Sequence, residues 1–110
     1  MIGRIGLRGR TDFEVVAREG SLAARCRGVE VSSSGIVVDR GRELYDRDQR
    51  LVMELELRLP EQREPGRALA RPVWYYGTHQ ALKFVAMTDA DRLCLAEHLD
   101  RLRERGVRLN

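Results

Sequence analysis

The chain has 110 residues, the usual size of one domain, so a second core of normal size does not fit. Hydrophobic residues make up 43% and charged residues 34%, and the formal net charge is +3. No apolar run is long enough for a membrane span or a secretion signal, so we expect a single, densely charged, cytoplasmic domain without membrane insertion.

The cysteines and the basic residues narrow the class of protein further. Cys26 and Cys94 lie far apart in the sequence and outside any Cys/His cluster, so neither a zinc site nor a disulfide framework is expected. Lys83 is the only lysine, so nearly all positive charge is arginine, whose planar fork binds phosphate or a guanine edge in bidentate fashion. Acidic residues interrupt the basic ones throughout, which argues against binding of DNA or RNA.

The chain divides into a glycine- and arginine-rich arm, residues 1–11, and a domain from residue 12 to residue 110. The arm shows neither strand nor helix periodicity and is expected to be flexible. Alternating or β-branched segments then predict six short strands, near residues 12–18, 22–31, 36–38, 53–59, 68–76 and 80–87. Pro72 indicates an edge position or a bulge in the fifth strand.

The connections between these strands are too short for crossover helices. Hairpins are expected at Glu19-Gly20-Ser21 and at Gly77-Thr78-His79. The sequence therefore favours an all-β fold, a six-stranded antiparallel barrel of the split-barrel type, over an α/β sheet. One helix is predicted at about residues 88–106, with Thr88 as its N-cap and Gly106 as its stop signal.

Patterns that indicate an enzyme are missing from the sequence. His79 falls in a predicted hairpin and His98 on the helix, and neither is spaced from a serine or cysteine as a nucleophile and base would be. Glu54, Glu56 and Arg58 follow one another on the same face of a predicted strand, which is typical of a face exposed to solvent. We therefore expect a protein without catalytic activity, metal or cofactor.

Two short motifs occur in a suggestive order. Arg4 and Arg8 form an R-x-x-x-R pair in the arm, and Glu30 to Gly35 come close to the pattern [DN]-x-S-x-x-G where one strand turns into the next. Two arginines on an arm can close over an anionic ligand from opposite sides. A carboxylate and a hydroxyl at a strand turn add groups that accept and donate hydrogen bonds.

These motifs, in this order, resemble the PilZ domain family. The resemblance extends to the alternating strand that ends at Pro60, to the later strands and to the closing helix. It implies a stand-alone receptor module for the bacterial second messenger cyclic di-GMP, whose N-terminal arm closes over the ligand and alters a surface that binds an effector protein. By the same resemblance, the ligand-binding residues would be Arg4, Arg8, Glu30, Ser32 and Gly35.

Other functions remain open at this stage. Glu30 stands where the family has Asp or Asn, and its extra methylene favours a degenerate PilZ domain that binds no messenger and acts as a protein-interaction adaptor in motility or pilus regulation. A small barrel that binds RNA is the third hypothesis. The aromatic run from Trp74 to Tyr76 fits either a binding platform or half-buried packing.

Overall fold

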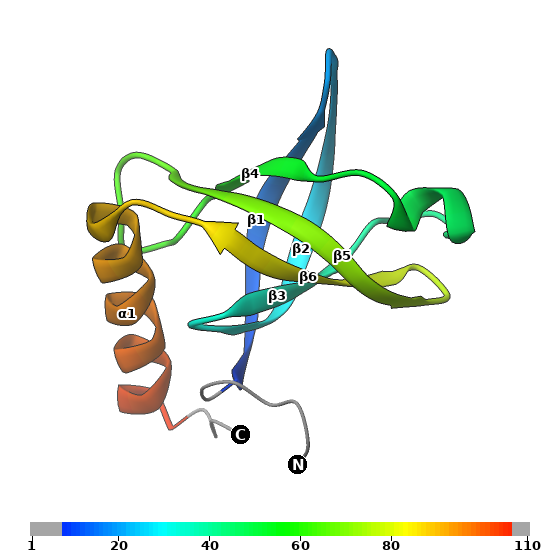
Figure 1. The fold of residues 1–110 in the computed structure, drawn as a ribbon. Helices are drawn as coiled ribbons and strands as arrows, with labels where there is room; N and C mark the ends of the chain where they lie inside the picture. The colour runs from blue at the N-terminus through cyan, green and yellow to red at the C-terminus, as the bar shows by residue number, and fades with distance from the viewer. Residues whose placement is uncertain (1–7, 107–110) are drawn as a thin grey trace.

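A computed structural model describes the chain over residues 8–106. Within this part, six antiparallel strands close into a barrel in the order β1-β2-β3-β6-β5-β4, and β4 pairs back onto β1 (Figure 1). The strands are β1 Arg8–Glu19, β2 Leu22–Ser32, β3 Gly35–Asp39, β4 Met53–Leu57, β5 Gly66–Tyr76 and β6 His79–Ala86. A short 3-10 helix, η1 Asp46–Gln49, precedes β4, and the helix α1 Asp89–Glu104 follows β6. The expected barrel with one C-terminal helix is confirmed.

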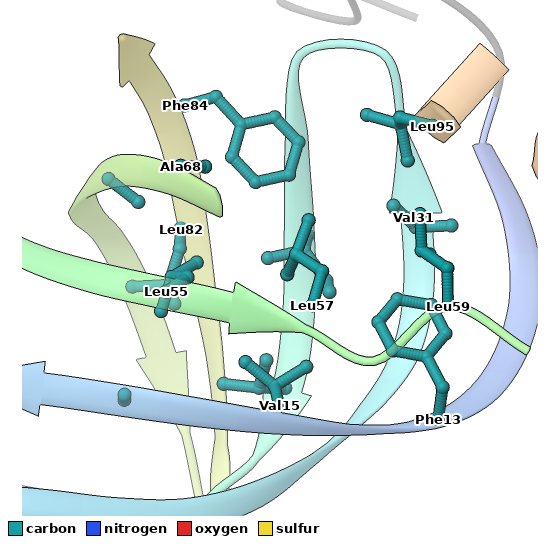
Figure 2. Close-up of a cluster of buried hydrophobic side chains, with 14 of the residues drawn as sticks. Phe13, Val15, Val31, Leu55, Leu57, Leu59, Ala68, Leu82, Phe84 and Leu95 are labelled. Atoms are coloured by element: carbon teal, nitrogen blue, oxygen red, sulfur yellow. The ribbon is translucent and has the colours of Figure 1, made fainter. Parts of the chain in front are cut away.

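Alternation along each strand sends every second side chain into the barrel. In β4, Met53, Leu55 and Leu57 are buried while Glu54 is exposed, as the sequence pattern predicts. Figure 2 shows apolar side chains from different strands and from α1 meeting in one cluster. The polar residues between them are left on the outside of the barrel, where a ligand or partner can reach them.

The two predicted hairpins are present, and each depends on a glycine. Gly20 and Gly77 are the first loop residues of the β1–β2 and β5–β6 hairpins and have φ values of 63° and 62°. A positive φ at the first of two loop residues is the geometry of a II′ turn, which matches the right-handed twist of the flanking strands. The turns therefore fix the register of both hairpins.

β1 begins at Arg8, so residues 8–11 belong to a strand and not to the predicted flexible arm. The sequence does not reveal this part of β1 because it is followed by a bulge, where the pairing with β2 shifts between Arg10 and Phe13. Such a bulge breaks the two-residue period on which recognition of a strand from sequence depends. The expected bulge in β5 is also present, where the pairing with β6 shifts between Pro72 and Trp74.

α1 closes one side of the barrel and packs against β5 and β1. The hydroxyl of Thr88 caps it by accepting the backbone N–H of Asp91 at 3.1 Å, as predicted, and the chain leaves the helix at Gly106 with φ of 81°. Its buried face consists of Leu95, His98 and Leu102. No helix within residues 8–106 has the length and apolar character needed to cross a membrane.

Candidate functional site

The end of β1 that carries arginines lies beside the β2–β3 turn. The Cα of Arg8 is the pairing partner of Ser32, and that of Arg10 is the partner of Glu30. The bulge that follows Arg10 does not disturb this pairing. The structure therefore brings the two predicted motifs to the same end of the barrel, although Arg4 and the side chain of Arg8 lie outside the described residues.

Ser32 organises the β2–β3 turn through its own hydroxyl group. It is 3% exposed, and its Oγ accepts the backbone N–H groups of Ser34 at 3.1 Å and of Gly35 at 3.2 Å. A side-chain oxygen that binds the next backbone N–H groups is a common way to stabilise a turn. A serine at this position thus stabilises the turn, in addition to the ligand contact that the sequence predicts for Ser32.

Gly35 also has a structural reason, which lies in β6 rather than in the turn. A Cβ built on Gly35 would lie 2.5 Å from the carbonyl oxygen of Leu82, a contact that side chains do not tolerate. The absent side chain allows β3 to pair closely with β6 at this point. The backbone of Gly35 is consequently held on the outer surface, opposite Lys83.

Glu30 lines a hollow on the outer face of the barrel. The hollow has a volume of about 460 Å³, and its other lining residues come from all five strands between β1 and β5: Arg10, Val29, Val37, Trp74 and His79. Glu30 is partly buried there, whereas Trp74 is 44% exposed. A carboxylate, a guanidinium and an indole face thus share one concave surface.

The strand register explains why these residues meet. Arg10 pairs with Glu30, Glu30 with Val37, Val37 with Ala81, and Ala81 with Trp74, so these five residues form a continuous row across five strands. Four steps of about 4.8 Å between strands give the row a length of roughly 19 Å along the barrel surface. We call this row and the next the ligand face.

The second row of the ligand face adds positive charge. Gly35 pairs with Lys83, and Lys83 pairs with Arg71, while Arg8 pairs with Ser32 on the other side of the turn. The side chains of Lys83 and Arg71 are exposed and lie two or three residues along their strands from the first row. Together with Arg10 of the first row, cations from three strands therefore border the surface that holds Glu30 and Trp74.

The opposite end of the ligand face carries an acidic residue. The backbone N–H of Gly41 donates to Asp39 at 2.9 Å, and this hydrogen bond, together with Thr78 and His79, holds the pKa of the Asp39 carboxyl below its ordinary value. Asp39 also lies 3.6 Å from Nε2 of His79. Asp39 therefore adds negative charge at the end of β3 that is farthest from Gly35.

Sequence reasoning missed several residues of this face. Arg71 and Lys83 pair within the β5–β6 hairpin, whereas Arg10 stands in β1, and only the register of the closed barrel brings Arg10 to the same surface. Alternation alone would have placed Lys83 outside the barrel, because Leu82 and Phe84 on either side of it are buried. The hypothesis that the aromatic run is a binding platform gains support from Trp74, because this residue lines the hollow.

Comparison with solved structures shows the fold. The chain superposes on the Bacillus subtilis inhibitor of motility MotI/DgrA with a TM-score of 0.79 at 18% identity, over 96% of this chain and 53% of that one. This chain therefore spans about half the length of that protein. An uncharacterised Legionella protein, Lpg0364, superposes with a TM-score of 0.52 at 20% identity, over 89% of this chain and 95% of that one. The architecture is a PilZ-like barrel.

Comparison by sequence adds no relative. No protein-family model matches the chain, and no curated protein matches it. The fold is thus shared with solved structures at 18% and 20% sequence identity.

Proposed function

We propose that this domain is a non-catalytic regulatory module that binds cyclic di-GMP on its ligand face and passes the signal to an effector protein. The observation that supports this most is the pairing of Arg8 with Ser32 and of Arg10 with Glu30, which joins the arginine segment to the acidic and hydroxyl turn. The PilZ-like barrel and its similarity to an inhibitor of motility are consistent with a role in motility regulation.

The chemistry of the ligand face matches the parts of the messenger. Cyclic di-GMP presents two phosphates and two guanines. Arginine can pair with a phosphate or with the O6 and N7 atoms of guanine, and Arg10, Arg71 and Lys83 supply cations on three strands. The exposed indole of Trp74 offers a flat surface on which a purine can stack, a contact worth about 1–3 kcal/mol per base.

Glu30 supplies selectivity for guanine in this proposal. A carboxylate accepts hydrogen bonds from the N1 and N2 hydrogens of guanine, which adenine lacks. The row places Glu30 beside Arg10 on one side and Val37 on the other, and Glu30 lines the hollow that these residues share. The longer side chain of glutamate shifts the acceptor by one methylene relative to aspartate, so Glu30→Asp changes the distance and keeps the charge.

Isothermal titration calorimetry tests the proposal with four ligands and three variants. Cyclic di-GMP should bind, whereas cyclic di-AMP, GMP and GTP should bind at least about tenfold more weakly. Arg10→Ala should weaken binding by about 5- to 150-fold, because a charged hydrogen-bond partner contributes about 1–3 kcal/mol.

Arg63→Ala is the matched control for that titration. Arg63 is an exposed arginine in the loop between β4 and β5, away from the ligand face, so its loss changes the net charge equally. Equal weakening by both substitutions would show a non-specific effect of charge. No heat of binding for the wild-type protein at high micromolar cyclic di-GMP would refute the proposal.

A protein-interaction adaptor without ligand is the second candidate, and one observation favours it. The hydroxyl of Ser32 already serves the turn by accepting two backbone N–H groups, so the motif residue has a use that needs no ligand. The variant Glu30→Asp separates the two candidates. If cyclic di-GMP binds only to the variant, the natural protein is an adaptor.

A further inference from the structure

A buried histidine connects the start of β1 to the helix and to a loop. The side chain of His98 on α1 is 1% exposed, and both of its ring nitrogens are in hydrogen-bond contact. Nε2 lies 2.8 Å from Oγ1 of Thr11 in β1, and Nδ1 lies 2.9 Å from Oε1 of Glu61 in the β4–β5 loop. The ring of Phe13 meets the imidazole edge to face, with centroids 5.2 Å apart. The histidine is therefore held on every side by polar or aromatic contacts.

The chemistry of the two partners indicates which tautomer the neutral ring adopts. An ionised carboxylate only accepts hydrogen bonds, so Nδ1 carries a proton toward Glu61. In the neutral ring, Nε2 then accepts the hydroxyl proton of Thr11. Glu61 is itself nearly buried at 9% side-chain exposure, and Arg105 of the α1 C-cap lies 4.0 Å from it. The network thus consists of a hydroxyl, an imidazole, a carboxylate and a guanidinium in sequence.

Thr11 is the residue through which this network reaches the ligand face. It follows Arg10 directly and lies inside the bulge where the pairing of β1 with β2 shifts. Residues in a bulge lose regular ladder hydrogen bonds, so other contacts must set their position. Here one such contact is the side-chain hydrogen bond between Thr11 and His98, directly after the arginines that pair with β2.

Resting on the proposed function, we propose that His98 is a positioning residue: it fixes the Arg8–Arg10 segment on the ligand face and couples ligand binding there to the docking of α1. Ligand contacts that hold Arg10 also hold Thr11, and Thr11 holds His98. Coupling between two sites is reciprocal, so contacts that secure α1 strengthen ligand binding by the same factor.

Two substitutions at Thr11 test the link. Thr11→Val removes the hydroxyl and keeps the branched shape, while Thr11→Ser keeps the hydroxyl and removes a methyl group. We expect amide hydrogen exchange at residues 9–13 to be about fivefold faster or more in Thr11→Val, because an unsatisfied buried partner costs about 1–3 kcal/mol. Thr11→Ser should exchange at close to the wild-type rate, and β5 and β6 should be unchanged in both variants.

A second control addresses the helix itself. Gln62 donates to Glu97 at 2.9 Å and so joins the same loop to α1 through a different hydrogen bond. Gln62→Ala should leave exchange at residues 9–13 unchanged. Equal exchange in wild type and Thr11→Val, or faster exchange across the whole barrel, would overturn the positioning role.

A separate experiment measures whether ligand binding is coupled to α1. A negative result for this coupling can then be distinguished from a negative result for the proposed function. Saturating cyclic di-GMP should slow exchange in α1 around His98 at least about threefold in the wild type and should have no such effect in Thr11→Val. The affinity of Thr11→Val for cyclic di-GMP should fall about fivefold, with recovery in Thr11→Ser. Binding without any change in α1 would overturn the coupling. Absence of binding to the wild type would refute the proposed function and the coupling, while the exchange comparison without ligand would still decide the positioning role.

Discussion

Gly35 offers the sharpest test of how the β2–β3 turn is built. It has a predicted role in ligand binding and a structural role in the pairing of β3 with β6, and a stability measurement without ligand tests the structural role alone. In Gly35→Ala, the new Cβ would lie 2.5 Å from the carbonyl oxygen of Leu82. That oxygen belongs to the backbone of β6 and cannot rotate away, so β3 has to move outward. Strain from such overpacking costs about 1–3 kcal/mol.

Thermal unfolding followed by circular dichroism measures this cost. For a domain of this size, each kcal/mol lowers Tm by about 4–8 °C, so we expect a decrease of roughly 4–24 °C. Gly66→Ala is the matched control, because the nearest atom to its new Cβ is 3.8 Å away and its φ is not positive. That variant should have an unchanged or slightly higher Tm.

A Gly35→Ala variant that melts like Gly66→Ala would refute the reasoning about the β3–β6 contact. If its stability falls as expected, any loss of ligand binding in this variant follows from displacement of β3. The glycine of the motif would then be explained by barrel packing, and ligand contact would have to be tested at other residues.

Three further predictions concern stability and reactivity. Ser32→Ala should lower the free energy of unfolding by about 1–2 kcal/mol in urea titration, because two backbone N–H groups lose their acceptor, whereas exposed Ser33→Ala should change it by less than about 0.5 kcal/mol. The hydrogen bond from Arg42 lowers the pKa of Asp48 to about 2, so this carboxylate stabilises the fold above its ordinary pKa of 3.8. That contribution should disappear as the pH falls through about 2. In Asp48→Asn, the free energy of unfolding should therefore depend less on pH in this acid range. Burial raises the pKa of the Cys26 thiol to about 11, so iodoacetamide at pH 8 should modify Cys26 much more slowly in the native protein than in denaturant, and equal rates would contradict its burial.

The strands and the helix could be predicted from the sequence because their signals are local. The alternation in β4, the glycines of the two hairpins and the Thr88 cap each act within a few residues, and the structure confirms them. The start of β1 could not be predicted, because the bulge after Arg10 interrupts the alternation. Local signals thus end where the ladder becomes irregular.

The candidate site could be predicted only in part. The motif placed Glu30, Ser32 and Gly35 at a strand turn, which the structure confirms as the β2–β3 turn, but their role in binding stays a prediction. The neighbours of Glu30 across the barrel come from strands that are distant in sequence, and no local pattern encodes that register.

The helix shows a similar limit. Leu93 is an apolar residue within the predicted helix, yet its side chain is 67% exposed. The sequence places His98 on the helix without indicating its environment, and the structure shows that its side chain is buried. The burial of a histidine depends on partners such as Thr11 and Glu61, which come from other parts of the fold.

The emission of Trp74 tests the central claim most directly, because it is the only tryptophan in the chain and belongs to the hollow on the ligand face. Titration with cyclic di-GMP should change its fluorescence in a saturable way, with a weaker response in Arg10→Ala and an unchanged response in Arg63→Ala. A constant emission up to high micromolar cyclic di-GMP, or an equal response in Arg10→Ala, would contradict binding at this face.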